Sequence, residues 1–297
     1  MKKILIPCDF SETAQEAFKF AIQLAEEHKN EIHVLYVIDM TFLGGSPSLS
    51  HAYTFNVQFM HDLEYDAKEK FQKMWEKYAP ITLAAKYRHK IGTLANEVRN
   101  YVDENNIDMV VMGTTGTGGS KWGSNVEKIV RTSPVPVLAI RRAPARPVQN
   151  IVVPVGMIEP DEAFVDQLKE LQRMLSGNLH LLYVNTPTFF TKDSTMHKRM
   201  QKFIERYDLM GCTTHFRSDM TVQEGIARFV KEKSYDMIAM GTHGWKGLAH
   251  FLFGSVAEDV VNGLEVPVWT CALERGAGSD SGNAGVKPLR REDAKMR

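Results

Sequence analysis

The sequence has few cysteines, no net charge and no long hydrophobic run, and each absence argues against a class of protein. Its three cysteines share no short spacing, which argues against a disulfide framework or a zinc site and favours reduced thiols in a cytoplasmic protein. Lys plus Arg and Asp plus Glu number 36 each, so no net field favours nucleic acid or an acidic membrane surface as a partner. No stretch approaches the roughly 20 apolar residues of a membrane span.

Several enzyme and nucleotide-binding motifs are also missing. A dinucleotide fingerprint would place Gly-x-Gly-x-x-Gly after the first strand, where Pro7, Cys8, Asp9 and Phe10 stand instead. A Walker loop with Gly-Lys-Ser or Gly-Lys-Thr is absent. No nucleophile–base–acid set recurs along the chain, and no residues have metal-ligand spacing. We therefore expect no catalytic residues and no enzyme activity beyond, at most, slow ATP hydrolysis.

What the chain does have is an internal repeat. The segment Asp-Met-Val-Val-Met-Gly-Thr-Thr-Gly at 108–116 reappears as Asp-Met-Ile-Ala-Met-Gly-Thr-His-Gly at 236–244. Each copy then reaches a Gly-Ser pair, at 123–124 and 254–255, and later a Pro-Val strand. At 297 residues and 43% hydrophobic composition, the chain is long enough for two domains with separate cores. The repeat therefore predicts one fold used twice.

Strands alternate with helices in both halves, which predicts βαβ units with parallel strands and right-handed crossovers. We expect each half to be an open, Rossmann-like α/β sandwich of five strands, with Ser11 as the N-cap of the first helix. The expected strands are residues 4–8, 32–37, 82–87, the segment ending at Met112, and 135–140 in the first half, and 151–155, 179–184, 213–217, the segment ending at Met240, and 266–271 in the second. The expected later helices are residues 63–78, 94–104, 196–209 and 222–233.

The domains are predicted at residues 1–142 and 150–273, with a linker at 143–149 and a low-complexity, disordered tail at 274–297. The first half carries 19 extra residues around 41–58, for which a solvated loop and a flap over a nucleotide crevice are both open interpretations.

Ligands of an open parallel sheet bind beyond the carboxyl ends of its strands. There, glycines let backbone N–H groups approach an anion, and the N-terminus of the next helix adds free N–H groups. Ser124 or Ser255 can donate to a phosphate or simply cap its helix. Asp9 can accept hydrogen bonds from ribose hydroxyls or an adenine amino group, or cap the first helix. His243 in the second loop has Thr115 as its counterpart, so a structural or ligand-contacting role is favoured over catalysis.

With these glycine motifs in both halves, the chain resembles the universal stress protein family in its tandem form. That family's pattern is Gly-x-x-Gly, nine residues, then Gly-Ser or Gly-Thr, after a strand that ends in Met-Gly-Thr. The second half matches it with Gly241, Gly244, Gly254 and Ser255, whereas the gap between Gly116 and Gly123 is three residues shorter. The resemblance covers about residues 1–142 and 149–272.

The resemblance implies an adenine-nucleotide site, since family members divide into those that bind ATP and those that do not. The aspartate after the first strand would contact the nucleoside, the end of the second strand the adenine, and the glycine loop the phosphates. The implied contacts are Pro7, Cys8, Asp9, Val37, Met112, Gly113, Gly116, Gly123, Ser124 and Asn125 in the first half, and Gly241, Gly244, Gly254 and Ser255 in the second.

The two implied sites are unequal, because Gly156 stands where Asp9 aligns. The first half keeps the carboxylate with a shortened loop, and the second keeps the loop without the carboxylate. The expected function is a cytoplasmic stress-response protein that binds ATP, with or without Mg²⁺, as a regulatory ligand in its first half. The alternative is a nucleotide-free scaffold that acts through protein partners, and a homodimer is compatible with either. The resemblance also implies that the halves pack as a pseudo-dimer through their fifth strands.

Overall fold

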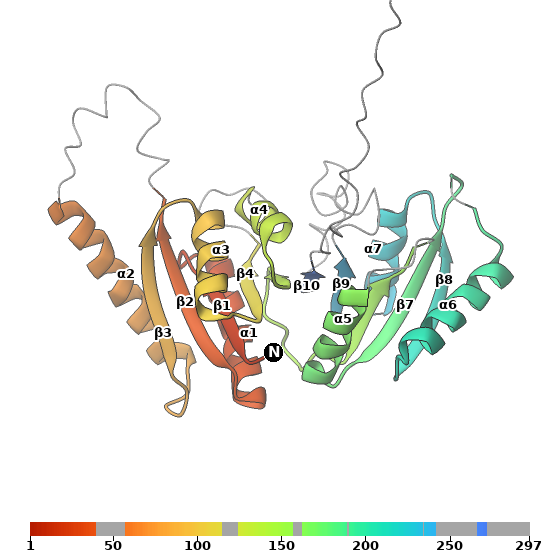
Figure 1. Cartoon of the computed structure of the whole chain (residues 1–297), viewed down its shortest axis with the longest axis horizontal. Helices are drawn as coiled ribbons and strands as arrows, with labels where there is room; N and C mark the ends of the chain where they lie inside the picture. Colours follow the sequence, from red (N-terminus) through yellow and green to blue (C-terminus); the bar gives the residue numbers. More distant parts are fainter. Residues whose placement is uncertain are drawn as a thin grey trace, which may run out of the picture.

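A computed structural model of the chain describes residues 1–39, 57–114, 124–156, 162–188, 190–233, 235–241 and 266–271 (Figure 1). Within these ranges both halves alternate strands and helices, as the repeat predicts.

Over its described residues, the first half contains five strands and four helices. Helix α1 begins where Ser11 accepts a hydrogen bond at its side chain from the N–H of Ala14, which confirms Ser11 as the N-cap. The elements are β1 (Lys3–Pro7), α1 (Glu12–His28), β2 (Glu31–Ile38), α2 (Val57–Tyr78), β3 (Ala85–Ile91), α3 (Leu94–Asn105), β4 (Met109–Gly113), α4 (Ser124–Thr132) and β5 (Val137–Ile140).

The second half repeats this order over the residues that the structure describes. Its elements are β6 (Asn150–Pro154), α5 (Glu162–Leu175), β7 (Asn178–Asn185), α6 (Asp193–Tyr207), β8 (Cys212–Ser218), α7 (Val222–Lys233), β9 (Met237–Gly241) and β10 (Val268–Cys271).

The ten strands in the described ranges form one continuous sheet in the order β3-β2-β1-β4-β5-β10-β9-β6-β7-β8 (Figure 1). Strand pairing is parallel within each half. It is antiparallel between β5 and β10, where Leu138 lies opposite Trp269. The predicted α/β fold with a parallel sheet in each half is confirmed, and so is the pairing of the fifth strands.

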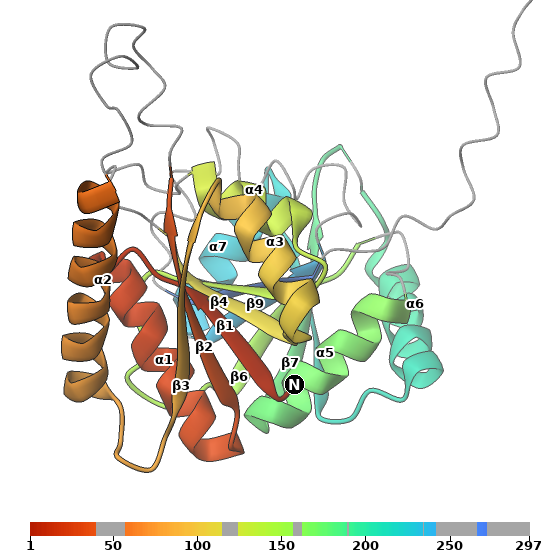
Figure 2. The same ribbon diagram turned by 60° about the vertical axis from the view of Figure 1, so that its left-hand side comes forward.

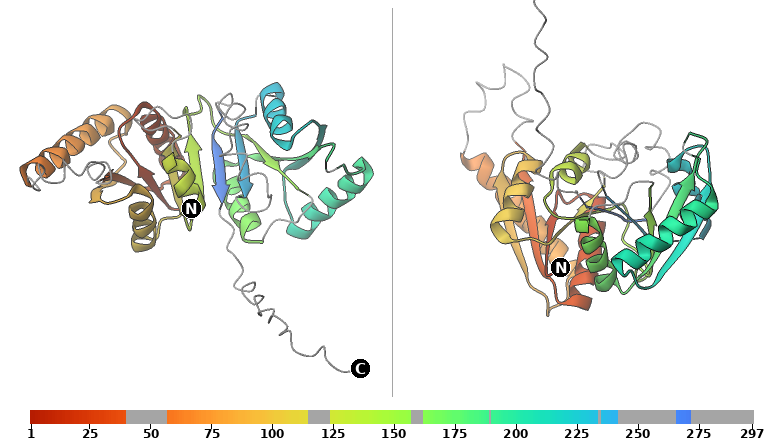
Figure 3. Two further views of the ribbon diagram at one scale, coloured as in Figure 1. Left: turned by 90° about the horizontal axis from the view of Figure 1, so that it is seen from above. Right: turned by 45° about the vertical axis from the view of Figure 1, so that its right-hand side comes forward.

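The two faces of this sheet are covered differently. On one face, α1, α2, α5 and α6 contribute to a single hydrophobic core that spans both halves. On the other face, α3 and α4 cover one core in the first half, and α7 covers a separate core in the second (Figures 2 and 3). The first face therefore couples the two halves, because its side chains pack continuously across the β5–β10 seam.

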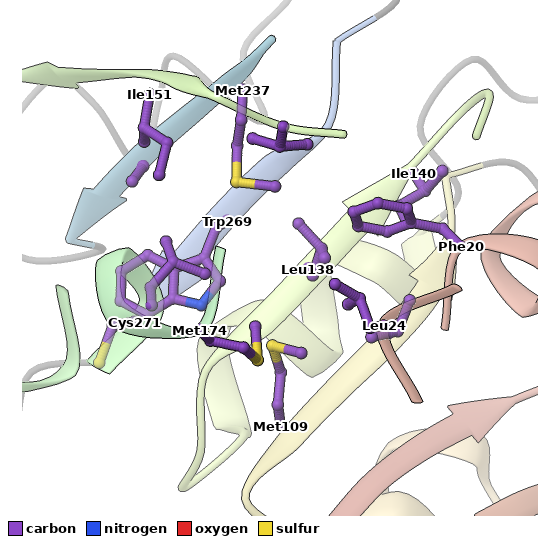
Figure 4. Close-up of a cluster of buried hydrophobic side chains, with 14 of the residues drawn as sticks. Phe20, Leu24, Met109, Leu138, Ile140, Ile151, Met174, Met237, Trp269 and Cys271 are labelled. Carbon is purple, nitrogen blue, oxygen red and sulfur yellow. The ribbon is translucent and has the colours of Figure 1, made fainter. Parts of the chain in front are cut away.

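Trp269 lies at the centre of this shared core (Figure 4). Its side chain is fully buried, and its ring centroid lies 6.1 Å from that of Phe164 on α5. The Thr270 hydroxyl, on the other face, donates a 3.1 Å hydrogen bond to the Val137 carbonyl across the seam. The seam is thus a buried, hydrogen-bonded interior and no longer two sheet edges.

The observed boundaries of helices and strands differ most from the predicted ones where polar side chains interrupt the apolar pattern. The strand expected at 82–87 is β3, at Ala85–Ile91, which lies at the edge of the sheet with four exposed residues, Lys86, Arg88, His89 and Ile91. Because exposed and half-buried residues alternate along β3, its sequence has no apolar run that marks where the strand ends. Helix α2 begins at Val57, earlier than the expected residue 63, whereas α7 matches its predicted range of 222–233.

Candidate functional site

The carboxylate of Asp9 lies at the carboxyl end of β1, and Asp9 is an exposed residue. Its Oδ1 accepts a 3.0 Å hydrogen bond from the N–H of Ser11, so Asp9 lies before the helix and does not cap it. Phe10, between them, has a φ of 62°, which a residue with a side chain rarely adopts. Such local strain is concentrated at binding sites and in switch segments, and here it shapes the turn that presents Asp9.

Three other predicted residues next to Asp9 have buried side chains. Pro7 ends β1, and the Cys8 side chain lies in the shared core with an exposed fraction of 4%. Burial raises the pKa of the Cys8 thiol to about 12, so this thiol is protonated and inert near neutral pH. Met112 is equally buried beneath α3 and α4. Only the main chain of these residues is available to a ligand.

Gly113 ends β4, on the strand directly beside β1. A Cβ added there would lie 2.6–2.7 Å from backbone atoms of Thr13 and Ala14 in α1. Glycine is therefore required for close packing of the strand end against the helix, independently of any ligand. The next residue, Thr114, donates its N–H to the Ile140 carbonyl at 3.0 Å.

The hydroxyl of Thr114 is buried and has no hydrogen-bond partner among the residues that the structure describes. An unsatisfied buried polar atom costs on the order of 1–3 kcal/mol. This hydroxyl lies where the glycine loop begins, and an acceptor that reaches it from the loop, such as a phosphate oxygen, would complete its hydrogen bonding.

A cleft of about 430 Å³ opens beside Asp9, between the N-terminal end of α1 and the face of α2. Its size is within the range of small-molecule sites. Three lysines of α2 line it, Lys70, Lys73 and Lys77, together with Tyr78. Lys70 forms a 2.7 Å ion pair with Asp66. Lys73 pairs with Glu69 at 2.5 Å, so carboxylates of α2 balance much of the positive charge beside Asp9.

The second half differs at the equivalent positions. Gly156, the counterpart of Asp9, is half-buried and offers no carboxylate. Val184, the counterpart of the half-buried Val37, has an exposed fraction of 3%. It is covered closely by α7, because a Cβ on Gly225 would lie 2.4 Å from Cγ1 of Val184. The end of β7 is therefore less accessible than the end of β2.

The glycine loops themselves lie mostly outside the described residues. Gly241 ends β9 and is half-buried, while Ser124 and the exposed Asn125 form the first turn of α4. The backbone N–H groups of that turn have no partner within the helix. Gly116, Gly123, Gly244, Gly254, Ser255 and His243 fall outside the described ranges.

The first residue of the repeated segment has a structural role that the motif alone did not reveal. Asp108 Oδ2 accepts from the N–H groups of Lys2 and Lys3 at 2.7 and 2.8 Å. Asp236 Oδ2 likewise accepts from the N–H groups of Gln149 and Asn150 at 3.1 and 2.9 Å. Both carboxylates fasten the start of a strand at the end of the sheet opposite the glycine loops. An aspartate begins both copies of the repeated segment, and this recurrence is the sequence signal for its role.

Neither a membrane-spanning helix nor a cluster of metal ligands is found among the described residues. No helix among them is long and apolar enough to cross a bilayer. No three His, Cys, Asp or Glu side chains within the same ranges are grouped as ligands of a metal ion.

Known proteins share this sequence pattern and this fold. The model of the universal stress protein family matches residues 1–141 and 147–271. The chain is 25% identical over 307 residues to universal stress protein Slr1230 of Synechocystis sp., which covers 91% of this chain and 99% of that relative. It is 30% identical over 144 residues to universal stress protein MJ0531 of Methanocaldococcus jannaschii, with coverage of 48% and 82%.

A crystal structure of a universal stress protein from Archaeoglobus fulgidus has the same fold. It aligns with a TM-score of 0.64 at 20% identity, over 92% of this chain and 97% of that one. Since the family model matches both repeats and together they span most of the sequence, the chain belongs to the universal stress protein family, with two family domains in tandem.

Proposed function

We propose that the first half binds an adenine nucleotide, ATP in the first instance, as a regulatory ligand at the carboxyl ends of β1, β2 and β4. The observation that carries the proposal is the buried hydroxyl of Thr114 where the glycine loop begins, which has no hydrogen-bond partner within the described part of the chain. Asp9 follows β1, and Thr114 follows the neighbouring strand β4. The two residues are therefore placed to contact the nucleoside and the phosphates of one nucleotide.

In this arrangement the Asp9 carboxylate accepts hydrogen bonds from ribose hydroxyls, and the half-buried Val37 contacts the adenine ring. The loop that follows Gly113 and the first turn of α4 donate N–H groups to the phosphates, and Thr114 donates its hydroxyl. Mg²⁺ would be coordinated mainly by the phosphates and water, as is usual for this ion. The residues of the site suit binding, and we propose no hydrolytic step.

The first half is favoured over the second for two physical reasons. It has a carboxylate at the nucleoside position, where the second half has Gly156. The end of β2 is also more accessible than the end of β7, where α7 covers Val184.

The test is extraction of bound ligand from freshly purified protein, followed by chromatographic identification, in two matched variants. We expect an adenine nucleotide in the natural protein and in Gly254→Arg, and none in Gly123→Arg. Asp9→Ala should weaken ATP binding by roughly 10–100-fold, the value of hydrogen bonds to a charged group. Retention of nucleotide by Gly123→Arg together with its loss from Gly254→Arg would move the site to the second half.

A nucleotide-free scaffold is the second candidate function, and one surface favours it. A cleft of about 890 Å³ lies between α2 and the edge strand β3. Phe71 and Tyr87 stack in it with ring centroids 4.6 Å apart, and Tyr65 beside them is 72% exposed. Aromatic surfaces of this kind are enriched at protein interfaces. Absence of extractable nucleotide, with no binding of added ATP, would favour this function.

A further inference from the structure

Two histidines and a threonine of the second half bring two ring nitrogens and one hydroxyl oxygen close together. His180 Nδ1 on β7 lies 3.1 Å from His215 Nε2 on β8. Thr213 Oγ1, also on β8, lies 2.8 Å from the first nitrogen and 3.1 Å from the second. We call His180, Thr213 and His215 the histidine cluster. Both imidazoles are half-buried, so an ion from solvent can reach them.

The hydrogen bonds behind His180 determine which of its nitrogens carries the proton. Asn150 Nδ2 donates to Asp236 Oδ2 at 3.3 Å, which turns the Asn150 amide oxygen toward His180. That oxygen lies 3.1 Å from His180 Nε2, so Nε2 must be the protonated donor. Nδ1 of the neutral ring therefore presents its lone pair to the cluster. A histidine oriented through its second nitrogen in this way is typical of metal sites.

Aromatic side chains hold both imidazoles in place. The ring centroids of Tyr235 and His180 are 4.7 Å apart, and those of Phe229 and His215 are 5.0 Å apart. An imidazole held in a fixed orientation is pre-organised as a metal ligand.

The distances between these three atoms fit coordination of one metal ion. Two ligand atoms that are each about 2.0–2.1 Å from a tetrahedral Zn²⁺ lie about 3.4 Å apart. The observed separations of 2.8–3.1 Å need to widen by only a few tenths of an ångström. We propose that the histidine cluster is a binding site for an imidazole-preferring divalent transition metal such as Zn²⁺, with His180 Nδ1 and His215 Nε2 as ligands. The Thr213 hydroxyl and water would complete the coordination shell.

The first half cannot form the same site. His33 occupies the position of His180, but its Nδ1 contacts the Tyr101 hydroxyl at 3.0 Å. Lys86 lies opposite His33 in the strand register, where Thr213 lies opposite His180, and Arg88 takes the place of His215. Ammonium and guanidinium groups do not bind cations, so the proposed site belongs to the second half alone. It also lies near the amino-terminal ends of β7 and β8, away from the proposed nucleotide site.

The proposal is tested by calorimetric titration of the full chain with ZnCl₂ at pH 7.5, in excess MgCl₂. We expect one zinc equivalent that His215→Gln and His180→Gln each weaken by more than tenfold. Asn150→Ala should weaken binding by about 10–100-fold through loss of ring orientation. The control is His89→Gln, on the equivalent edge strand β3, where His89 pairs with Glu64 at 3.1 Å; this variant should bind zinc like the natural protein.

Thermal unfolding of each variant without metal verifies that it folds. A separate measurement, ¹H–¹⁵N NMR of the metal-free imidazoles, should show His180 protonated at Nε2. No zinc binding by the natural protein, or binding by folded His215→Gln as tight as in the natural protein, would overturn the proposal. His180 protonated at Nδ1 would contradict the orientation on which the proposal depends.

Discussion

Replacing Gly113 by alanine tests the packing that places the glycine loop. The added Cβ would lie 2.6 Å from the carbonyl carbon of Thr13 and 2.7 Å from the Ala14 nitrogen. Ordinary contacts between such atoms are about 3.5–4.0 Å, so the strand end and the helix must separate by about 0.8 Å. All three nearest atoms belong to the backbone of α1, and a backbone cannot rotate away as a side chain can.

Overpacking of this kind costs about 1–3 kcal/mol, and the rigid neighbour favours the upper value. Alanine recovers about 0.5–1 kcal/mol of backbone entropy relative to glycine. The free energy of unfolding should therefore fall by about 2 kcal/mol. At about 2–4 °C per kcal/mol for a protein of this size class, Tm should fall by roughly 4–8 °C.

Urea denaturation and thermal melting measure both quantities. Gly177→Ala is the matched control, because its nearest contact is the end of a flexible side chain, Ile151 Cδ1, at 3.1 Å. We expect this control to lose less than about 1 kcal/mol. If Gly113→Ala unfolds within about 0.5 kcal/mol of the natural protein, the close contact with α1 does not constrain this position and the reasoning is refuted.

Three further predictions concern the seam, the sheet ends and pH. Trp269→Ala should lower the free energy of unfolding by about 3–5 kcal/mol in urea denaturation, and a loss below 1 kcal/mol would contradict a shared core. Asp236→Ala should cost about 2–3 kcal/mol in the same assay, because the N–H groups of Gln149 and Asn150 lose their acceptor; an unchanged urea midpoint would exclude this role. Burial lowers the pKa of His33, so the unfolded chain binds more protons below about pH 6.5. The stabilisation that depends on neutral His33 should be complete above that pH and should be lost as the pH drops toward the pKa of His33 in the folded protein. In melting experiments at different pH values, His33→Gln should reduce the dependence of Tm on pH. An unchanged dependence would refute the role assigned to His33.

Local patterns were sufficient to predict most of the fold. The apolar run at residues 151–155 and its counterpart at 4–8 each correspond to a buried strand, because strands covered on both faces are hydrophobic throughout. The predicted range 82–87 differs from the observed strand Ala85–Ile91, because this strand lies at an edge of the sheet, where the side-chain pattern is weak.

The candidate site was predictable only in part. The position of Asp9 at a strand end follows from the order of elements, since parallel strands bring their carboxyl ends to one edge. The burial of Cys8 follows from its place in the apolar run at residues 4–8. The contact between Gly113 and α1, and the absence of a partner for the Thr114 hydroxyl among the described residues, depend on how the helices pack on the sheet. Neither of these two features has a signature in residue order.

The sequence by itself determined that this protein contains one α/β unit twice, and that only the first copy has an aspartate after its first strand. Both facts follow from residue identity and local periodicity. The tertiary structure decided that one face of the sheet has a core common to both copies, that α7 covers Val184, and that His180 and His215 meet across neighbouring strands. These features arise from packing between segments distant in the chain, where side-chain shape and register, rather than local pattern, set the contacts.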